Sequence, residues 1–118
     1  MHGVRYKDDL AYYDRFTQEL QEHEYLGDMV KEKLIYYPVV SREEVKHKGR
    51  LTDLMRNGKM FTDIGLPRID PAVHRAMLCG SPAMLKETSE VLNEFGLTVS
   101  PKVGQRGDYL IERAFVEQ

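Results

Sequence analysis

Arginine side chains recur in the sequence where short apolar runs end. Arg5 closes the stretch Gly3–Arg5, Ser41 and Arg42 follow the run that ends at residue 40, and Arg50 closes the polar loop that comes next. The guanidinium group is a planar fork of donors that matches phosphate oxygens. Ligands of open α/β sheets bind at the carboxyl ends of the strands. These residues therefore predict an anion site, and an arginine near the adenosine ribose is also how a site distinguishes NADP from NAD.

An alternative for the arginines is that they are solvated loop residues paired with Glu43 and Glu44, because surface ion pairs are common. The four histidines are too scattered along the chain for a metal site. The chain contains neither the G-x-G-x-x-G nor the G-x-x-x-x-G-K-[ST] motif. The familiar glycine-rich phosphate loops are therefore absent from this stretch of sequence.

The single cysteine, Cys79, lies in "MLCGSP", where an apolar run meets Gly80 and Pro82 opens a predicted helix. A helix N-terminus favours an anion and can lower the pKa of a thiol, while Gly80 would let a ligand approach the backbone. The alternative is an inert, buried thiol at a strand end. A nucleophilic cysteine needs a base, and no histidine has a spacing that places it beside Cys79. The sequence therefore argues against a cysteine hydrolase.

The elements that would position these residues alternate between helix and strand. We expect helices over residues 8–22, 51–58 and 82–95, strands over 33–40, 74–78 and 108–116, connections over 26–32 and 59–71, and a short extended piece over 97–100. Ser81 is the predicted cap of the third helix and Gly96 its end. Leu110 and Ile111 are adjacent, which predicts a final strand covered on both faces. The class is α/β, a three-layer open and mainly parallel sheet.

Bulk properties exclude several classes. The chain has 118 residues, one domain or part of one, and its net charge of −2 provides no basic field for nucleic acid. Its apolar runs are far shorter than the roughly 20 residues that cross a bilayer, and its first residues lack the apolar core of a signal peptide. A lone cysteine favours a reducing, cytoplasmic setting.

Four stretches, taken together and in this order, carry a family resemblance. "HGVRYKDDLAY", "VVSRE…GRLTDLM", "MLCGSPAML" and "GDYLIERAF" resemble the bacterial ferredoxin (flavodoxin)–NADP⁺ reductases. That family has an N-terminal β-barrel that binds FAD and a C-terminal α/β domain that binds NADP(H), and it exchanges electrons between NADPH and ferredoxin or flavodoxin. The resemblance implies that residues 1–118 are a partial NADP(H)-binding domain with a flavin-facing tail over 114–118.

The resemblance also assigns roles to individual residues. It implies that the 2′-phosphate and adenosine end of NADP(H) contacts Arg5, Ser41, Arg42 and Arg50. It places Cys79 against the nicotinamide as the catalytic residue, with Gly80 and Pro82 shaping the approach, and it implies that Cys79 orients the ring rather than attacking it. Ala114 and Phe115 would lie close to the isoalloxazine of FAD. Relatives often end in lysine, whereas this chain ends in Gln118.

Against the family pattern, the FAD domain and the first strand of the NADP domain are missing. By analogy that strand lies between the strands that end at Gly3 and at Cys79, so we expect two unpaired inner edges, an inactive chain and self-association. Two alternatives remain open: the reductase component of an oxygenase with another electron acceptor, and a non-enzymatic α/β interaction module. The module would have its arginines neutralised by Glu43 and Glu44 and no cleft at the strand ends.

Overall fold

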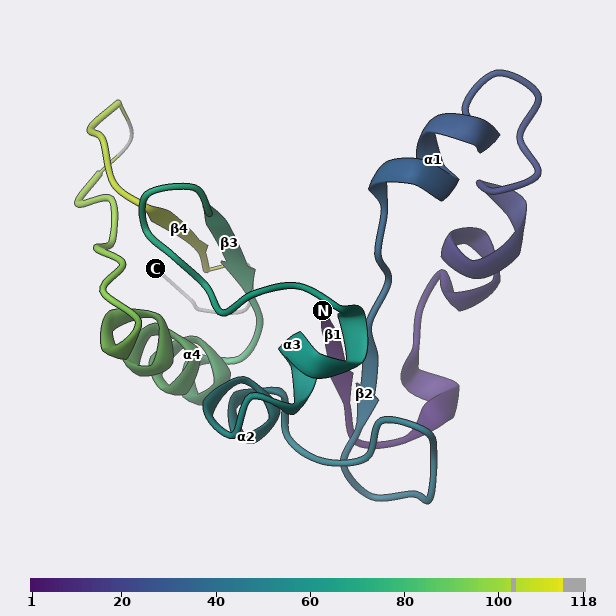
Figure 1. Ribbon diagram of the computed structural model, residues 1–118. Helices are drawn as coiled ribbons and strands as arrows, with labels where there is room; N and C mark the ends of the chain where they lie inside the picture. The colour runs from purple at the N-terminus through teal and green to yellow at the C-terminus, as the bar shows by residue number, and fades with distance from the viewer. Residues whose placement is uncertain (103, 114–118) are drawn as a thin grey trace. The chain divides into compact units, whose positions relative to one another are not determined.

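The computed structural model describes residues 1–102 and 104–113 (Figure 1). The chain divides into two compact units, Met1–Ile64 and Gly65–Gln118, called here the first and the second unit. None of the helices in the described ranges is long and apolar enough to cross a membrane.

The first unit is built around a pair of short parallel strands. Its elements are β1 (His2–Val4), a 3₁₀ turn (Lys7–Asp9), a π-helical turn (Arg15–Glu19), α1 (Gly27–Lys33), β2 (Pro38–Val40), α2 (Leu51–Arg56) and α3 (Lys59–Ile64). Val4 pairs with Val40 in the parallel register, and Val39 and Val40 are buried. β-branched side chains fit such a covered strand, and Pro38 stands at its first position, where a missing N–H is tolerated.

Four expectations for the first unit are wrong in detail. The helix expected over 8–22 is instead two short turns, because Tyr12 adopts a left-handed conformation with φ of 62° that interrupts a helical ladder. The connection expected over 26–32 is helix α1, and the irregular stretch expected over 59–71 begins with helix α3. The strand expected over 33–40 is shortened, because α1 continues to Lys33 and pairing with β1 starts only at Pro38.

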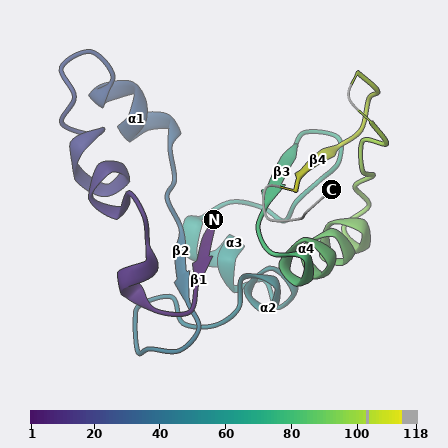
Figure 2. The same ribbon diagram turned by 180° about the vertical axis from the view of Figure 1, so that it is seen from behind.

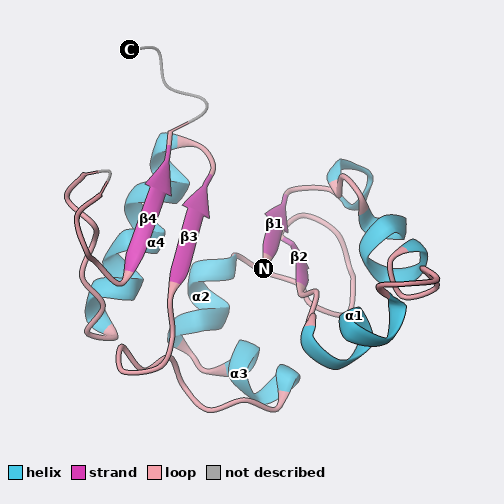
Figure 3. Ribbon diagram, turned by 90° about the horizontal axis from the view of Figure 1, so that it is seen from above, coloured by secondary structure: helices cyan, strands magenta, loops and turns pink. Residues whose placement is uncertain are grey.

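The second unit packs one helix on another parallel pair, β3 (Ala76–Cys79) and β4 (Tyr109–Glu112) (Figure 3). Helix α4 (Pro82–Glu94) starts at the Ser81 cap with Pro82 at its first position, as predicted, and the chain leaves it at Gly96 with φ of +90°.

Only one face of this strand pair is covered within the described residues. Leu78 and Tyr109 are buried, as are Leu85, Val91 and Leu92 of α4. On the other face Met77 is 83% exposed and Leu110 49% exposed. The expectation that the final strand is covered on both faces is therefore wrong for the described residues, because successive strand residues point to opposite sides.

Both strand pairs are parallel, which confirms the α/β class with parallel strands. The view from behind shows β1 beside β2 and β3 beside β4 (Figure 2). Among the described strands, β1 has β2 as its one partner and β3 has β4. One edge of β1 and one edge of β3 are thus open. A strand missing between them stays a prediction.

Candidate functional site

Three of the predicted site residues lie together where β1 and β2 end. The backbone N–H of Ser41 donates to the carbonyl of Val4 at 3.0 Å, and that of Arg42 donates to the carbonyl of Arg5 at 3.0 Å. Backbone hydrogen bonds therefore still join the two segments just beyond the ends of β1 and β2. Arg5 and Arg42 are exposed and Ser41 is half-buried, so two guanidinium groups and a hydroxyl leave neighbouring points of one backbone layer.

The loop over residues 41–49 then returns to the strand at which it began. Val40 donates to the carbonyl of His47 at 3.1 Å and accepts from the N–H of Gly49 at 2.9 Å. Gly49 has φ of +132°, a conformation that favours glycine. The next two residues are Arg50, which is exposed, and Leu51.

Leu51 also holds Arg50 near β1. A Cβ on Gly3 would lie 2.6 Å from Cδ2 of Leu51, so the bare backbone of β1 is what lets Leu51 pack there. Arg5 follows Gly3 by two residues. The three arginines therefore belong to one structural neighbourhood, which we call the arginine site: Arg5, Ser41, Arg42 and Arg50.

The two carboxylates of the alternative interpretation have other partners. Glu43 accepts a hydrogen bond from the backbone N–H of Lys7 at 2.5 Å, and Glu44 pairs with Lys48 four residues on. Both contacts tie the loop to itself or to the start of the 3₁₀ turn. In both contacts the carboxylate meets a partner outside the arginine site. A group of guanidinium side chains favours an anionic ligand.

A cluster of titratable side chains that the sequence interpretation missed supports the same loop. Oδ2 of Asp63 accepts from the Tyr37 hydroxyl at 2.5 Å and from Nζ of Lys59 at 2.8 Å, and it lies 3.4 Å from Nδ1 of His47. We call these four residues the Asp63 cluster. No spacing in the sequence links them, because they come from the residue before β2, from the loop and from α3.

Electrostatics in the Asp63 cluster follow from these contacts. Hydrogen bonds from Lys59 and Tyr37 hold the pKa of Asp63 below its ordinary value. Burial, followed by the hydrogen bond to Asp63, raises the pKa of Tyr37. Burial, together with the charges of Lys46 and Lys59, lowers the pKa of His47 below its ordinary value against the raising effect of the Asp63 carboxylate. At neutral pH the imidazole is therefore uncharged while the carboxylate beside it is ionised.

Cys79 stands at the last position of β3 and is exposed, so the alternative of a buried thiol is wrong. The turn that follows is fixed by the hydroxyl of Ser81, which accepts from the N–H of Met84 at 3.2 Å. A Cβ on Gly80 would lie 2.7 Å from Sδ of Met84. Packing of Met84 is thus one physical reason for glycine here, beside the predicted approach of a ligand.

The histidine of the second unit, His74, is not placed to act as a base for Cys79. His74 precedes β3, at the end opposite Cys79, and accepts from the N–H of Asp70 at 2.9 Å. His23 accepts from the N–H groups of Tyr25 and Leu26. Within the part of the chain that the structure describes, no group of three or more His, Cys, Asp or Glu side chains could hold a metal ion.

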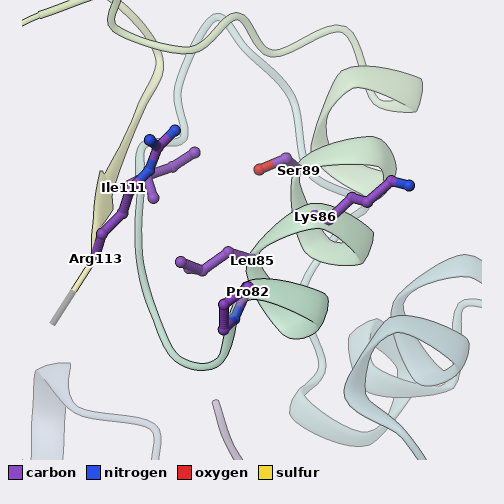
Figure 4. A pocket seen from close by; sticks show the side chains of 6 residues that line it. All are labelled: Pro82, Leu85, Lys86, Ser89, Ile111 and Arg113. Atoms are coloured by element: carbon purple, nitrogen blue, oxygen red, sulfur yellow. The ribbon is translucent and has the colours of Figure 1, made fainter. Parts of the chain in front are cut away.

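Pro82 lines a cavity of about 380 Å³ between α4 and β4 (Figure 4). Leu85, Lys86, Ser89, Ile111 and Arg113 complete its wall. The hydroxyl of Ser89 is buried and has no hydrogen-bond partner among the described residues. Figure 4 shows Arg113 and Ile111 facing Leu85 and the hydroxyl of Ser89, while the side chain of Lys86 points away from them. No motif in the sequence had indicated this hollow.

Two groups of the predicted site residues remain separate in this description. Arg42 belongs to the first unit and Cys79 to the second, so a shared sheet edge for them stays a prediction. Ala114 and Phe115, predicted to lie near a flavin, fall outside the described residues.

The chain is similar in sequence to known reductases. It is 64% identical over 118 residues to "Ferredoxin--NADP reductase" of Pseudomonas aeruginosa and 61% identical over 118 residues to that of Azotobacter vinelandii, which covers all of this chain and 46% of each relative. It is 39% identical to "Flavodoxin/ferredoxin--NADP reductase" of Rhodobacter capsulatus, over 98% of this chain and 43% of the relative. No protein-family model matches it.

The fold has a counterpart among solved structures. A crystal structure of a ferredoxin NADP⁺ reductase from Neisseria gonorrhoeae, with bound FAD and NADP, superposes with a TM-score of 0.77 at 23% identity, over 97% of this chain and 43% of that chain. The resemblance found in the sequence is confirmed. The chain spans a little less than half the length of the curated relatives it matches.

Proposed function

We propose that this chain, which is similar over its whole length to part of the ferredoxin–NADP reductases, is the NADP(H)-binding portion of such an enzyme. The complete protein would exchange electrons between NADPH and ferredoxin or flavodoxin, in the cytoplasm and without nucleic acid or membrane as a partner. The observation that carries the proposal is the arginine site, in which backbone hydrogen bonds hold Arg5 and Arg42 side by side.

The arginine site suits a phosphate that is not part of a glycine-rich loop. Guanidinium groups form charge-assisted, bidentate hydrogen bonds to phosphate oxygens, and the Ser41 hydroxyl adds a further donor. NADP(H) differs from NAD(H) only by the 2′-phosphate on the adenosine ribose. A cluster of arginines at two strand ends is therefore a means of selecting NADPH over NADH.

Cys79 is assigned to the other end of the nucleotide. Its exposed side chain follows β3 beside a turn that Ser81 fixes, which suits a group that orients a flat ring. His74, the histidine of the same unit, lies at the opposite end of β3 from Cys79. FAD, when bound, accepts the hydride of NADPH and passes electrons on singly. We assign most of the FAD contacts to the portion of the relatives that this chain does not match, with Ala114 and Phe115 as the contribution of residues 114–118.

The test replaces Arg42 with alanine in the complete reductase. Loss of one charge-assisted hydrogen-bonding group should cost about 1.5–3 kcal/mol, which corresponds to a rise of roughly 10- to 150-fold in the KM for NADPH. The KM for NADH should change little. Arg15→Ala is the matched control, because Arg15 is an exposed arginine of the same unit that lies 3.7 Å from Glu19.

Binding by the isolated chain provides a second measurement. Titration with 2′-phospho-AMP should show tighter binding than titration with AMP, and Arg42→Ala should remove the difference. Equal affinity for the two nucleotides, or equal increases in both KM values, would contradict the assignment of the arginine site.

A further inference from the structure

We propose that His47 is a positioning residue for the arginine site, and that it sets nucleotide specificity by anchoring the loop over residues 41–49 to the Asp63 cluster. This rests on the proposed function of that site. Its action would pass through the backbone of the loop, whose start carries Arg42 and whose end is followed by Arg50.

The imidazole of His47 is clasped on two sides. Its ring lies 4.3 Å from the ring of Tyr37, centroid to centroid, at 30° between planes. Its Nδ1 lies 3.4 Å from Oδ2 of Asp63 but forms no hydrogen bond among the described residues, and only 15% of the side chain is exposed. An apolar stacking surface and a carboxylate together define one place for this ring.

Tyr37 and Asp63, which contact the imidazole, are themselves held by other contacts in the first unit. Tyr37 is 3% exposed and directly precedes β2, the strand whose end carries Ser41 and Arg42. Asp63 stands on α3, and its Oδ2 is held by hydrogen bonds from both Tyr37 and Lys59. The Asp63 cluster therefore links β2 to α3 independently of the loop.

The backbone of His47 transmits this position to the arginines. Its carbonyl accepts from Val40, the last residue of β2, and Gly49 then donates back to Val40. Arg42 leaves the loop near its start and Arg50 directly follows its end. If the imidazole is removed, the return of the loop is held by the backbone bonds at its base and by the exposed pair of Glu44 and Lys48, which is worth little in water.

A loosened loop should weaken contacts to the 2′-phosphate and leave the nicotinamide end unchanged. We therefore expect His47→Ala in the complete reductase to raise the KM for NADPH about fivefold, equivalent to about 1 kcal/mol. The kcat with NADPH and the KM for NADH should stay the same. A purely structural role would move both KM values together or neither.

Matched variants separate the contact of His47 with the Tyr37 ring from its contact with the Asp63 carboxylate. His47→Phe keeps the ring against Tyr37 and loses the nitrogen that faces Asp63, so it should behave like His47→Ala. His47→Gln retains a polar group that can face Asp63 and should restore most of the NADPH affinity. His23→Ala is the control, because His23 is another histidine of the first unit that accepts backbone hydrogen bonds. It should leave every kinetic constant unchanged.

The outcomes distinguish this inference from the function on which it rests. If Arg42→Ala fails to discriminate NADPH from NADH, the proposed function is wrong. If Arg42→Ala discriminates and both His47→Ala and His47→Phe match the unmodified enzyme, the positioning role of His47 is wrong. Should His47→Ala not fold, the contrast between His47→Phe and His47→Gln decides, because equal KM values for NADPH in these two would overturn the role.

Discussion

The cap of α4 offers a quantitative test of how the second unit is held together. Ser81 has φ of −63° and ψ of 157°, and its hydroxyl accepts from the N–H of Met84 at 3.2 Å. Ser81→Ala leaves that donor without its partner, and loss of such a cap costs about 1 kcal/mol. Leu85, Val91 and Leu92 of α4 are buried in the core of the second unit. The loss of the cap should therefore lower the free energy of unfolding of that unit as a whole.

The assay is equilibrium unfolding of the chain in urea, followed by far-ultraviolet circular dichroism. With a urea dependence of about 1.5 kcal/mol per molar, a cost of about 1 kcal/mol lowers the unfolding midpoint by about 0.7 M. Ser81→Asp retains an acceptor and adds negative charge at a helix N-terminus, so its midpoint should equal or exceed that of the unmodified chain.

Ser89→Ala is the matched control within the same helix. The hydroxyl of Ser89 has no partner among the described residues, and alanine has the higher helix propensity, so this midpoint should not fall. A midpoint for Ser81→Ala within error of that of Ser89→Ala would refute the reasoning, since the two serines would then contribute equally despite their different contacts.

Two further predictions concern the second unit. Cys79 is exposed, so it should react completely with a thiol-specific disulfide reagent in the absence of denaturant, and a thiol that reacts only after unfolding would contradict the structure. Hydrogen bonds from the N–H and the hydroxyl of Thr98 lower the pKa of Asp108 in the folded chain. Its stabilising contribution is then fully present above the ordinary carboxyl pKa of about 3.9 and is lost as the pH falls through the lower folded-state pKa. The measurement is the urea unfolding midpoint between pH 5 and pH 2, which should fall less in Asp108→Asn than in the unmodified chain. An equal fall in both chains would count against the two hydrogen bonds.

Local signals were sufficient for the second unit. A serine followed by proline started α4 and a glycine ended it, because capping and left-handed termination depend on the residues at those positions alone. A mainly parallel sheet was also expected from the alternation of strands and helices, and β3 and β4 are parallel. Which face of β3 is covered was not, because an apolar run does not reveal where its partner lies.

The first unit shows where local reasoning fails. Tyr12 lies in a left-handed conformation that its residue type disfavours, so the helical spacing of neighbouring apolar residues was misleading. Helices α1 and α3 have seven and six residues, and such short helices depend on tertiary contacts rather than on propensity.

The candidate site divides in the same way. The strand-end arginines could be identified because residues that follow parallel strands share an edge. Tyr37, His47 and Asp63 meet only after folding, and their separations of 10 and 16 residues carry no motif.

The open side of β3 has a practical consequence for anyone who handles this chain. A row of backbone amides and carbonyls there, next to the bare Met77, is a template on which a strand of another molecule can add. Two-stranded sheets are also barely stable on their own in water. The concentration at which the chain begins to aggregate should therefore depend on this open edge more than on the buried core. A charged residue introduced along β3 should raise that concentration.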